Sequence, residues 1–309
     1  MKAVYYLRNL AVRALTLIVL ALVRVLPEEA SYRMGEGLAR FAYRVWPRFK
    51  RVSLANLDIF FGASKTGTEK ERIAADAFVN LGYTVIEFMR MGFIPKEKVV
   101  AMVIEARGVE NVRNGMAQGK GVIGLGMHYG NWELSGAYMP LTGIPLSAVG
   151  KEQTDDFFTN IAFPYRERLG VTNIFRADKA SSAVIRALRT NQVLGLLADQ
   201  NAGGSGVFVD FAGKAASTFK GPALLQMKFG SPMMVIRCER ISPGRLRFVA
   251  EPPLDLNDLP LTEDARAAEI ARRMNAAYER VIRQDPAQWL WVHKRWKTRP
   301  PGETAAAPL

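Results

Sequence analysis

The sequence predicts an α/β fold: a single domain in which a mixed sheet is flanked by helices. From Val99 onward, short apolar runs of strand length alternate with helical patterns, an order typical of a sheet with helices on both faces. Before Val99 the apolar residues recur at helical spacing. No repeat or linker interrupts residues 31–299, so we expect one domain there, preceded by an added helix in residues 1–30 and followed by a disordered tail at residues 300–309.

The first helix is expected over Tyr5 to Leu26, where only Arg8, Arg13 and Arg24 are charged. Its wholly apolar stretch is about ten residues long, half of the roughly 20 that cross a bilayer squarely. We interpret it as a membrane helix that either lies in the interface or spans marginally, with its arginines reaching lipid phosphates. A helix packed on the protein's own core is the alternative, whereas a signal peptide is disfavoured because no small-residue cleavage site follows. Basic residues after it would keep the next segment on the cytoplasmic face: Arg40, Arg44, Arg48, Lys50 and Arg51.

Residues 32–94 are expected to be helical, with a polar loop from Gly62 to Thr68. The apolar positions that recur at helical spacing are Leu38, Phe41, Ala42 and Val45, then Phe78, Leu81, Val85, Ile86 and Met89. The runs expected as strands are Val100 to Ile104, Val122 to Met127, Leu146 to Val149, Thr172 to Phe175, Val193 to Ala198, Met233 to Cys238 and Leu246 to Ala250. Further helices are expected at Ser181 to Thr190, Gly221 to Gly230 and Thr262 to Arg283.

The composition indicates a globular protein with an anionic partner. Apolar residues make up 49% of the chain, which is ample for a buried core. The formal net charge of +13 and the pI near 10.0 fit nucleic acid, an anionic membrane surface or an acidic protein. The amphiphilic amino terminus argues against nucleic acid. The single cysteine, Cys238, allows neither an internal disulfide nor a Cys-x-x-Cys metal site, so a reducing compartment is expected.

His128 and Glu133 form the first candidate site. The histidine follows the apolar run Val122 to Met127 and so lies where a strand ends, at a rim that substrates can reach. A helix starting near Asn131 would carry Glu133 in its first turn, facing back toward the imidazole. A carboxylate beside one ring nitrogen fixes the tautomer, and the other nitrogen can then take a proton from a hydroxyl nucleophile. A core histidine bonded to a backbone carbonyl is the alternative.

Several familiar motifs fit poorly. The glycines of Gly124 to Gly130 have the wrong spacing for a dinucleotide loop, and the histidine and tyrosine among them would obstruct a pyrophosphate. Gly115 to Lys120 lacks the spacing and the Ser or Thr of a P-loop. A serine hydrolase or a zinc peptidase has no support, because neither Gly-x-Ser-x-Gly nor His-Glu-x-x-His occurs.

Two later segments also contain residues suited to a functional site. Asp199 and Gln200 follow a predicted strand, where Asp199 either contributes to a site or caps a turn. Pro286 to Lys297 holds three tryptophans among cationic residues, which either complete a core or line a membrane interface beside anionic headgroups.

Together these features resemble the late lipid A acyltransferases of Gram-negative bacteria, lauroyl and myristoyl transferases within the lysophospholipid acyltransferase superfamily. The resemblance covers nearly the whole chain and rests on the amino-terminal helix, Arg51 followed by Asn56-Leu57, His128 with Glu133, Arg166 to Gly170, Asp199-Gln200 with Val207 to Gly213, Thr218 to Ala223, and Pro286 to Lys297. One departure is Asn201 to Gly204, where many lipid A enzymes carry a further acid or histidine. The segment His128 to Glu133 also resembles mycobacterial phosphatidylinositol mannoside acyltransferases.

The resemblance implies an O-acyltransferase on the cytoplasmic face of the bacterial inner membrane. It would move a fatty acyl group from the thioester of acyl carrier protein, or from acyl-CoA, to a hydroxyl of a lipid A precursor, without a metal or a cofactor. His128 would deprotonate the hydroxyl and Glu133 would hold the imidazole. Residues that would bind substrate are Arg166, as a cation for the oxyanion or a phosphate, with Asn131, Asp199 and Gln200. The basic surface suits an acidic carrier protein. The alternatives are an acyltransferase of another glycolipid and a non-catalytic protein that binds anionic lipid.

Overall fold

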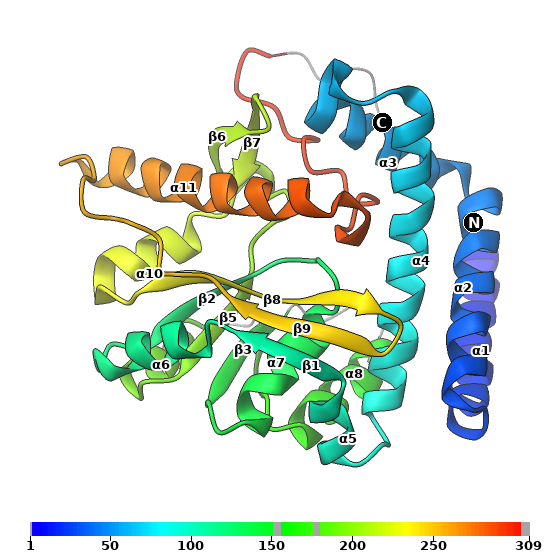
Figure 1. Cartoon of the computed structure of the whole chain (residues 1–309). Helices are drawn as coiled ribbons and strands as arrows, with labels where there is room; N and C mark the ends of the chain where they lie inside the picture. The colour runs from blue at the N-terminus through cyan, green and yellow to red at the C-terminus, as the bar shows by residue number, and fades with distance from the viewer. Residues whose placement is uncertain (1, 151–155, 176–179, 304–309) are drawn as a thin grey trace.

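The computed structural model describes residues 2–150, 156–175 and 180–303, and it confirms the α/β class with a mixed sheet (Figure 1). The strands of the main sheet follow the order β1-β9-β8-β2-β5-β3-β4. Their bounds are β1 (Val103–Arg107), β2 (Val122–Gly126), β3 (Leu146–Gly150), β4 (Thr172–Phe175), β5 (Val193–Leu197), β8 (Met233–Ser242) and β9 (Arg245–Ala250). Neighbouring strands are parallel except for β8 and β9, which form an antiparallel pair.

Helices cover both faces of this sheet (Figure 1). One face carries α9 (Ala180–Arg189), α10 (Gly221–Phe229), α11 (Glu263–Gln284) and the hairpin of β6 (Val207–Phe211) and β7 (Lys214–Thr218). The other carries α5 (Lys96–Ala101), α6 (Val109–Ala117), α7 (Trp132–Leu141) and α8 (Asp156–Arg168). At one end of the sheet stand α4 (Gly67–Met91), α3 (Pro47–Phe61), α2 (Glu28–Val45) and α1 (Lys2–Val25). Short 3-10 turns are η1 (Gly62–Ser64), η2 (Gly203–Ser205) and η3 (Pro286–Gln288).

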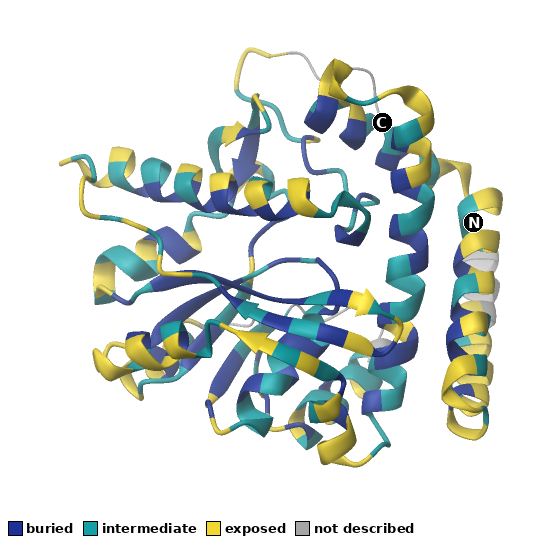
Figure 2. Cartoon of the chain, viewed as in Figure 1, coloured by how far each residue is buried: buried dark blue, intermediate teal, exposed yellow. Residues whose placement is uncertain are grey.

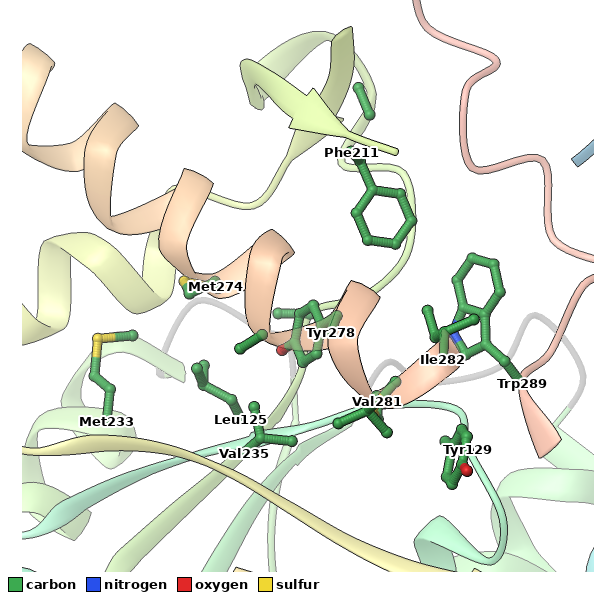
Figure 3. Packing of buried hydrophobic residues seen from close by; sticks show 14 of the residues in the cluster. Leu125, Tyr129, Phe211, Met233, Val235, Met274, Tyr278, Val281, Ile282 and Trp289 are labelled. Carbon is green, nitrogen blue, oxygen red and sulfur yellow. The ribbon is translucent and has the colours of Figure 1, made fainter. Parts of the chain in front are cut away.

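The side chains of β2 alternate between two cores, as the pleat of a strand requires. Leu125 packs beneath Tyr278 and Val281 of α11 (Figure 3), whereas Val122 belongs to the core on the α7 side. Buried residues line both faces of the sheet and the inner side of α11 (Figure 2). Gly124 and Gly126 occupy the β2 positions that face α7, so the strand presents no side chains there.

Two elements differ from the expectation. The strand expected at Val100 to Ile104 begins only at Val103, because Lys96–Ala101 forms α5 and turns Val99 inward as a buried helical residue. Val207 to Gly213, which the sequence suggests is a loop, instead forms β6 and the turn of the β6–β7 hairpin, where Ala212 and Gly213 have positive φ.

The amino-terminal helix is present, but a membrane-spanning role for it is not supported. In the described part of the chain, no helix has both the length and the apolar content that a membrane crossing needs. Instead, α1 buries Val19 and Val23 against Tyr32 and Ile86, as expected of a helix packed on the protein itself. Much of its other side is exposed apolar surface, including Leu15 and Ile18. Of the predicted tail at 300–309, residues 304–309 lie outside the described residues.

Candidate active site

The pairing of β2 with β5 brings His128 and Asp199 together. These parallel strands are in register with an offset of 71 residues, as in the pair Gly126 and Leu197. His128 and Asp199 each lie two residues beyond that pair and keep the same offset. The Nδ1 atom of His128 lies 2.8 Å from Oδ1 of Asp199.

Asp199 is a buried carboxylate held by three donors. It accepts hydrogen bonds from the His128 ring, from the His128 backbone N–H at 2.8 Å and from the indole N–H of Trp289 at 2.8 Å. Burial acts to raise the pKa of Asp199, but the His128 imidazole and these hydrogen bonds outweigh it and hold the pKa below its usual range. An ionised carboxylate only accepts hydrogen bonds, so Nδ1 of His128 carries the proton and Nε2 is left as the basic nitrogen.

His128 lies in the wall of a cavity of about 640 Å³, a volume within the range of ligand pockets. The cavity lies between the sheet and helices α7 and α8. On the sheet, the cavity is lined by three small residues that pair side by side across adjacent strands: Gly124 of β2, Gly195 of β5 and Ala148 of β3. Apolar side chains complete most of the remaining wall: Met139, Leu146, Val149, Phe163, Val171, Leu196, Leu197, Phe219 and Ile236.

Glu133 does not hold His128, which corrects the pairing expected from the sequence. Its carboxylate instead accepts two hydrogen bonds from Arg166, from Nε at 2.8 Å and from Nη2 at 2.6 Å. Both side chains line the cavity. Burial acts to lower the pKa of Arg166, but the Glu133 carboxylate outweighs it and raises that pKa above its ordinary value. The structure thus places two hydrogen-bonded pairs at one cavity, His128 with Asp199 and Arg166 with Glu133.

Of the other expected site residues, Gln200 lines the cavity but Asn131 does not. Asn131 is buried and caps α7: its Oδ1 accepts from the backbone N–H of Leu134 at 2.8 Å, and its Nδ2 donates to Glu87 at 2.8 Å. Its amide is therefore engaged inside the protein, and a substrate-binding role for Asn131 has no support. No group of metal-ligating side chains occurs in the part of the chain that the structure describes.

A buried polar network fixes the loop that carries the histidine. Glu87 and Arg240 form an ion pair whose two members are both buried. Thr84 donates to the carbonyl oxygen of Gly130 at 2.7 Å. Gly130 has φ +55°, and a Cβ there would lie 2.0 Å from the Cys238 carbonyl oxygen, so only glycine fits. This network could not be predicted from the sequence, because its members come from distant segments.

The tryptophans of Pro286 to Lys297 complete a core, which resolves the alternative that the sequence left open. Trp289, Trp291 and Trp296 are 3%, 1% and 3% exposed. Trp289 also donates to Asp199, a role that the sequence analysis missed although it noted the unusual tryptophan density.

A histidine–carboxylate pair at the wall of a largely apolar cavity is an arrangement by which enzymes can activate a hydroxyl for group transfer. Comparison with known proteins identifies the class further. The family model described as bacterial lipid A biosynthesis acyltransferase matches residues 2–298, and the chain belongs to this family. It is accordingly an O-acyltransferase.

Characterised relatives cover most of the chain. It is 28% identical to the lipid A biosynthesis lauroyltransferase of Escherichia coli over 92% of this chain and 90% of that protein. It is 26% identical to the lipid A biosynthesis palmitoleoyltransferase of the same organism, over 91% and 89%. It is also 24% identical to the phosphatidylinositol mannoside acyltransferase of Mycobacterium tuberculosis, over 89% and 85%.

Proposed function

We propose that this protein transfers a fatty acyl group from a thioester to a hydroxyl of a lipid A precursor, at the cytoplasmic face of a bacterial inner membrane. The observation that carries the proposal is the His128–Asp199 pair in the wall of a largely apolar cavity. The names of the lauroyl and palmitoleoyl transferases support lipid A as the acceptor.

In the proposed reaction His128 is the general base and Asp199 the group that orients it. Nε2 takes the proton of the acceptor hydroxyl as its oxygen attacks the thioester carbonyl carbon. The tetrahedral intermediate collapses with cleavage of the carbon–sulfur bond, and the leaving thiolate takes the proton back from the imidazolium. Asp199 stabilises that imidazolium, because its ionised carboxylate already accepts from Nδ1.

Arg166 is the proposed cation for substrate charge. Glu133 occupies Nε and Nη2 of its guanidinium, and the described residues provide no acceptor for Nη1. The guanidinium lies in the cavity wall with Trp132, whose ring centroid is 5.2 Å from that of His128. A donor so placed can serve the oxyanion or a headgroup phosphate. Gln200, also in the wall, is proposed to contact the acceptor.

The acyl chain of the donor is proposed to lie along the row of small residues on β2, β5 and β3. The absence of bulky side chains at Gly124, Gly195 and Ala148 leaves room there, and the surrounding wall is apolar. Acyl carrier protein is the proposed donor, with acyl-CoA as the alternative, because a net charge of +13 favours an acidic partner. No cofactor is needed for this chemistry.

The acceptor is tested by mass spectrometry of the host's glycolipids with and without the gene. Loss of one acyl chain from lipid A supports the proposal, and loss from another glycolipid would favour the alternative suggested by the mannoside acyltransferase relative. Unchanged lipids, together with vesicle binding that survives His128→Ala, would instead indicate a non-catalytic lipid-binding protein. Reintroducing the His128→Ala gene, which removes the proposed base, is the control for catalysis.

A further inference from the structure

The exposed apolar side chains of this protein are concentrated at one end of the molecule. Most of the large ones in the described residues belong to α1, α2 and the start of α3. We define the α2–α3 corner as Leu38 to Arg51, where α2 ends and α3 begins at Trp46. Its exposed apolar residues are Leu38, Phe41, Val45, Trp46 and Phe49, at 40%, 62%, 44%, 54% and 41% exposure.

These side chains face outward because another side of α2 packs against α4. A Cβ on Gly82 of α4 would lie 2.8 Å from that of Ala39, so the two helices pack closely through small residues. Leu38, Phe41 and Val45 recur at intervals of three and four on a different side of the helix, which gives α2 a second apolar stripe. Each of these three side chains remains at least 40% exposed.

The charges of the corner identify what would cover it. Leu38 to Arg51 contains five cationic residues and no acid. Arg40 is paired with Glu36 and Lys50 with Glu71. Arg44, Arg48 and Arg51 are exposed and have no carboxylate partner among the residues that the structure describes. Exposed aromatic rings beside unpaired arginines match the boundary between acyl chains and anionic headgroups.

We propose that the α2–α3 corner is a membrane-binding surface in its own right, which inserts Phe41, Trp46 and Phe49 into an anionic phospholipid bilayer. Pro47 at the start of α3 ends α2 sharply, so Trp46 and Phe49 project from a helix junction. The arginines Arg44, Arg48 and Arg51 bind headgroup phosphates. This surface is distinct from α1 and does not depend on acyl transfer, so it would hold even if the proposed acceptor were wrong.

The test measures flotation of the full chain with vesicles of phosphatidylglycerol and phosphatidylcholine, or of phosphatidylcholine alone. The variant F41S/W46S/F49S is expected to lower the partition coefficient at least about tenfold on the anionic vesicles. The matched control I104S/L224S/I241S replaces side chains that are 45%, 43% and 48% exposed on other elements, and it should bind like the wild type. Wild-type binding by the corner variant would overturn the proposal.

The arginines are tested separately with R44Q/R48Q/R51Q, which should lose at least about tenfold on anionic vesicles and little on neutral ones. An equal loss on both would overturn the headgroup role. If the corner variants altered the protein's self-association but left vesicle binding intact, a second copy of the chain would cover the corner and the membrane proposal would be wrong.

A labelling experiment keeps the proposal testable if the serine variant fails to fold. Cys238 is buried, so an environment-sensitive dye can be attached selectively at a new surface cysteine. Dye at F49C should shift its emission to the blue on anionic vesicles, whereas dye at L224C should not. Equal behaviour at the two positions would overturn the proposal.

Discussion

The contact between His128 and Asp199 should carry most of the chemistry, and Asp199→Asn tests it. Asparagine keeps the size of the side chain but loses the charge that stabilises the imidazolium. We expect kcat for acyl transfer to fall by about 10²–10⁴, with KM changed little, because the interaction matters most in the transition state. Steady-state rates in detergent micelles measure this, and the exposed Asp264→Asn is the control. A kcat within threefold of the wild type would remove Asp199 from the mechanism.

The identity of the acid could not have been predicted from local sequence. The local sequence favours Glu133, which lies five positions from His128, where the first turn of a helix would face it back toward the ring. Asp199 lies 71 residues away and reaches the ring only because β2 and β5 are adjacent and in register. The histidine itself was recognisable, since it follows an apolar strand that ends in glycines.

Arg166 should serve substrate charge, and Arg166→Lys separates this role from a structural one. Lysine keeps the charge but cannot hold Glu133 with two parallel donors and still offer a third, as the guanidinium does. We expect kcat/KM on the full glycolipid to fall at least about tenfold, near 1.4 kcal/mol of transition-state binding. The thermal midpoint should be measured alongside, because the pair is part-buried. Wild-type turnover by a folded lysine variant would exclude the role.

His293 should make folding sensitive to mild acid. Burial lowers the pKa of His293 to about 4, below the ordinary value of about 6.5. Between these two pH values His293 binds a proton in the unfolded chain but not in the folded chain. The free energy of unfolding is therefore at its full value above pH 6.5 and falls as the pH drops toward 4. The loss should total about 2 to 3 kcal/mol. Denaturant unfolding from pH 7 to 4.5 should show a shallower decline for His293→Gln. Identical slopes for both proteins would contradict the assignment.

At the scale of elements, the depth of the cavity should set the length of the acyl chain. Gly136 of α7 lines the cavity, and a Cβ there would meet nothing within 4 Å. Gly136→Leu should therefore fill the cavity without disturbing the core. Each methylene that can no longer be buried loses about 0.8 kcal/mol, or about fourfold in selectivity. Competition between donors of different chain length should show a preference for shorter chains.

A matched control for this substitution is Gly37→Leu. Gly37 also lies within a helix and has no neighbour within 4 Å of a Cβ, but it is exposed on α2, away from the cavity. Gly37→Leu should have a similar effect on the backbone contribution to stability as Gly136→Leu. It should leave the preference for acyl-chain length unchanged in micelles. An equal shift in both variants would mean that the cavity does not select chain length.

Apolar patterning predicted most strands within a few residues, because a buried parallel strand is a continuous apolar run. The prediction failed where a short apolar run is compatible with either a helix or a strand. Val100 and Ala101 begin the run that is expected as a strand, yet they are the last two residues of α5. The β6–β7 hairpin was missed because its turn has Ala212 at positive φ, a conformation for which alanine gives no signal.

At the scale of the whole molecule, the strand order could not be derived from the sequence. The neighbours of β2 are β5 and β8, which follow it by several intervening elements. The strand order determines which strand ends are neighbours, and therefore which residues come together in the site. What the sequence did reveal at this scale is the charge, since a net charge of +13 does not depend on topology.

That charge should determine which donor the enzyme uses best. Acyl carrier protein is acidic, so its encounter with a protein of net charge +13 is accelerated by attraction that salt screens over a Debye length of about 10 Å at 0.1 M. We expect kcat/KM with acyl carrier protein to fall at least about tenfold as NaCl is raised from low to above physiological concentration. Acyl-pantetheine, the same thioester without the charged carrier, should show little dependence. Parallel curves for both donors would mean that the carrier protein is not recognised through its charge.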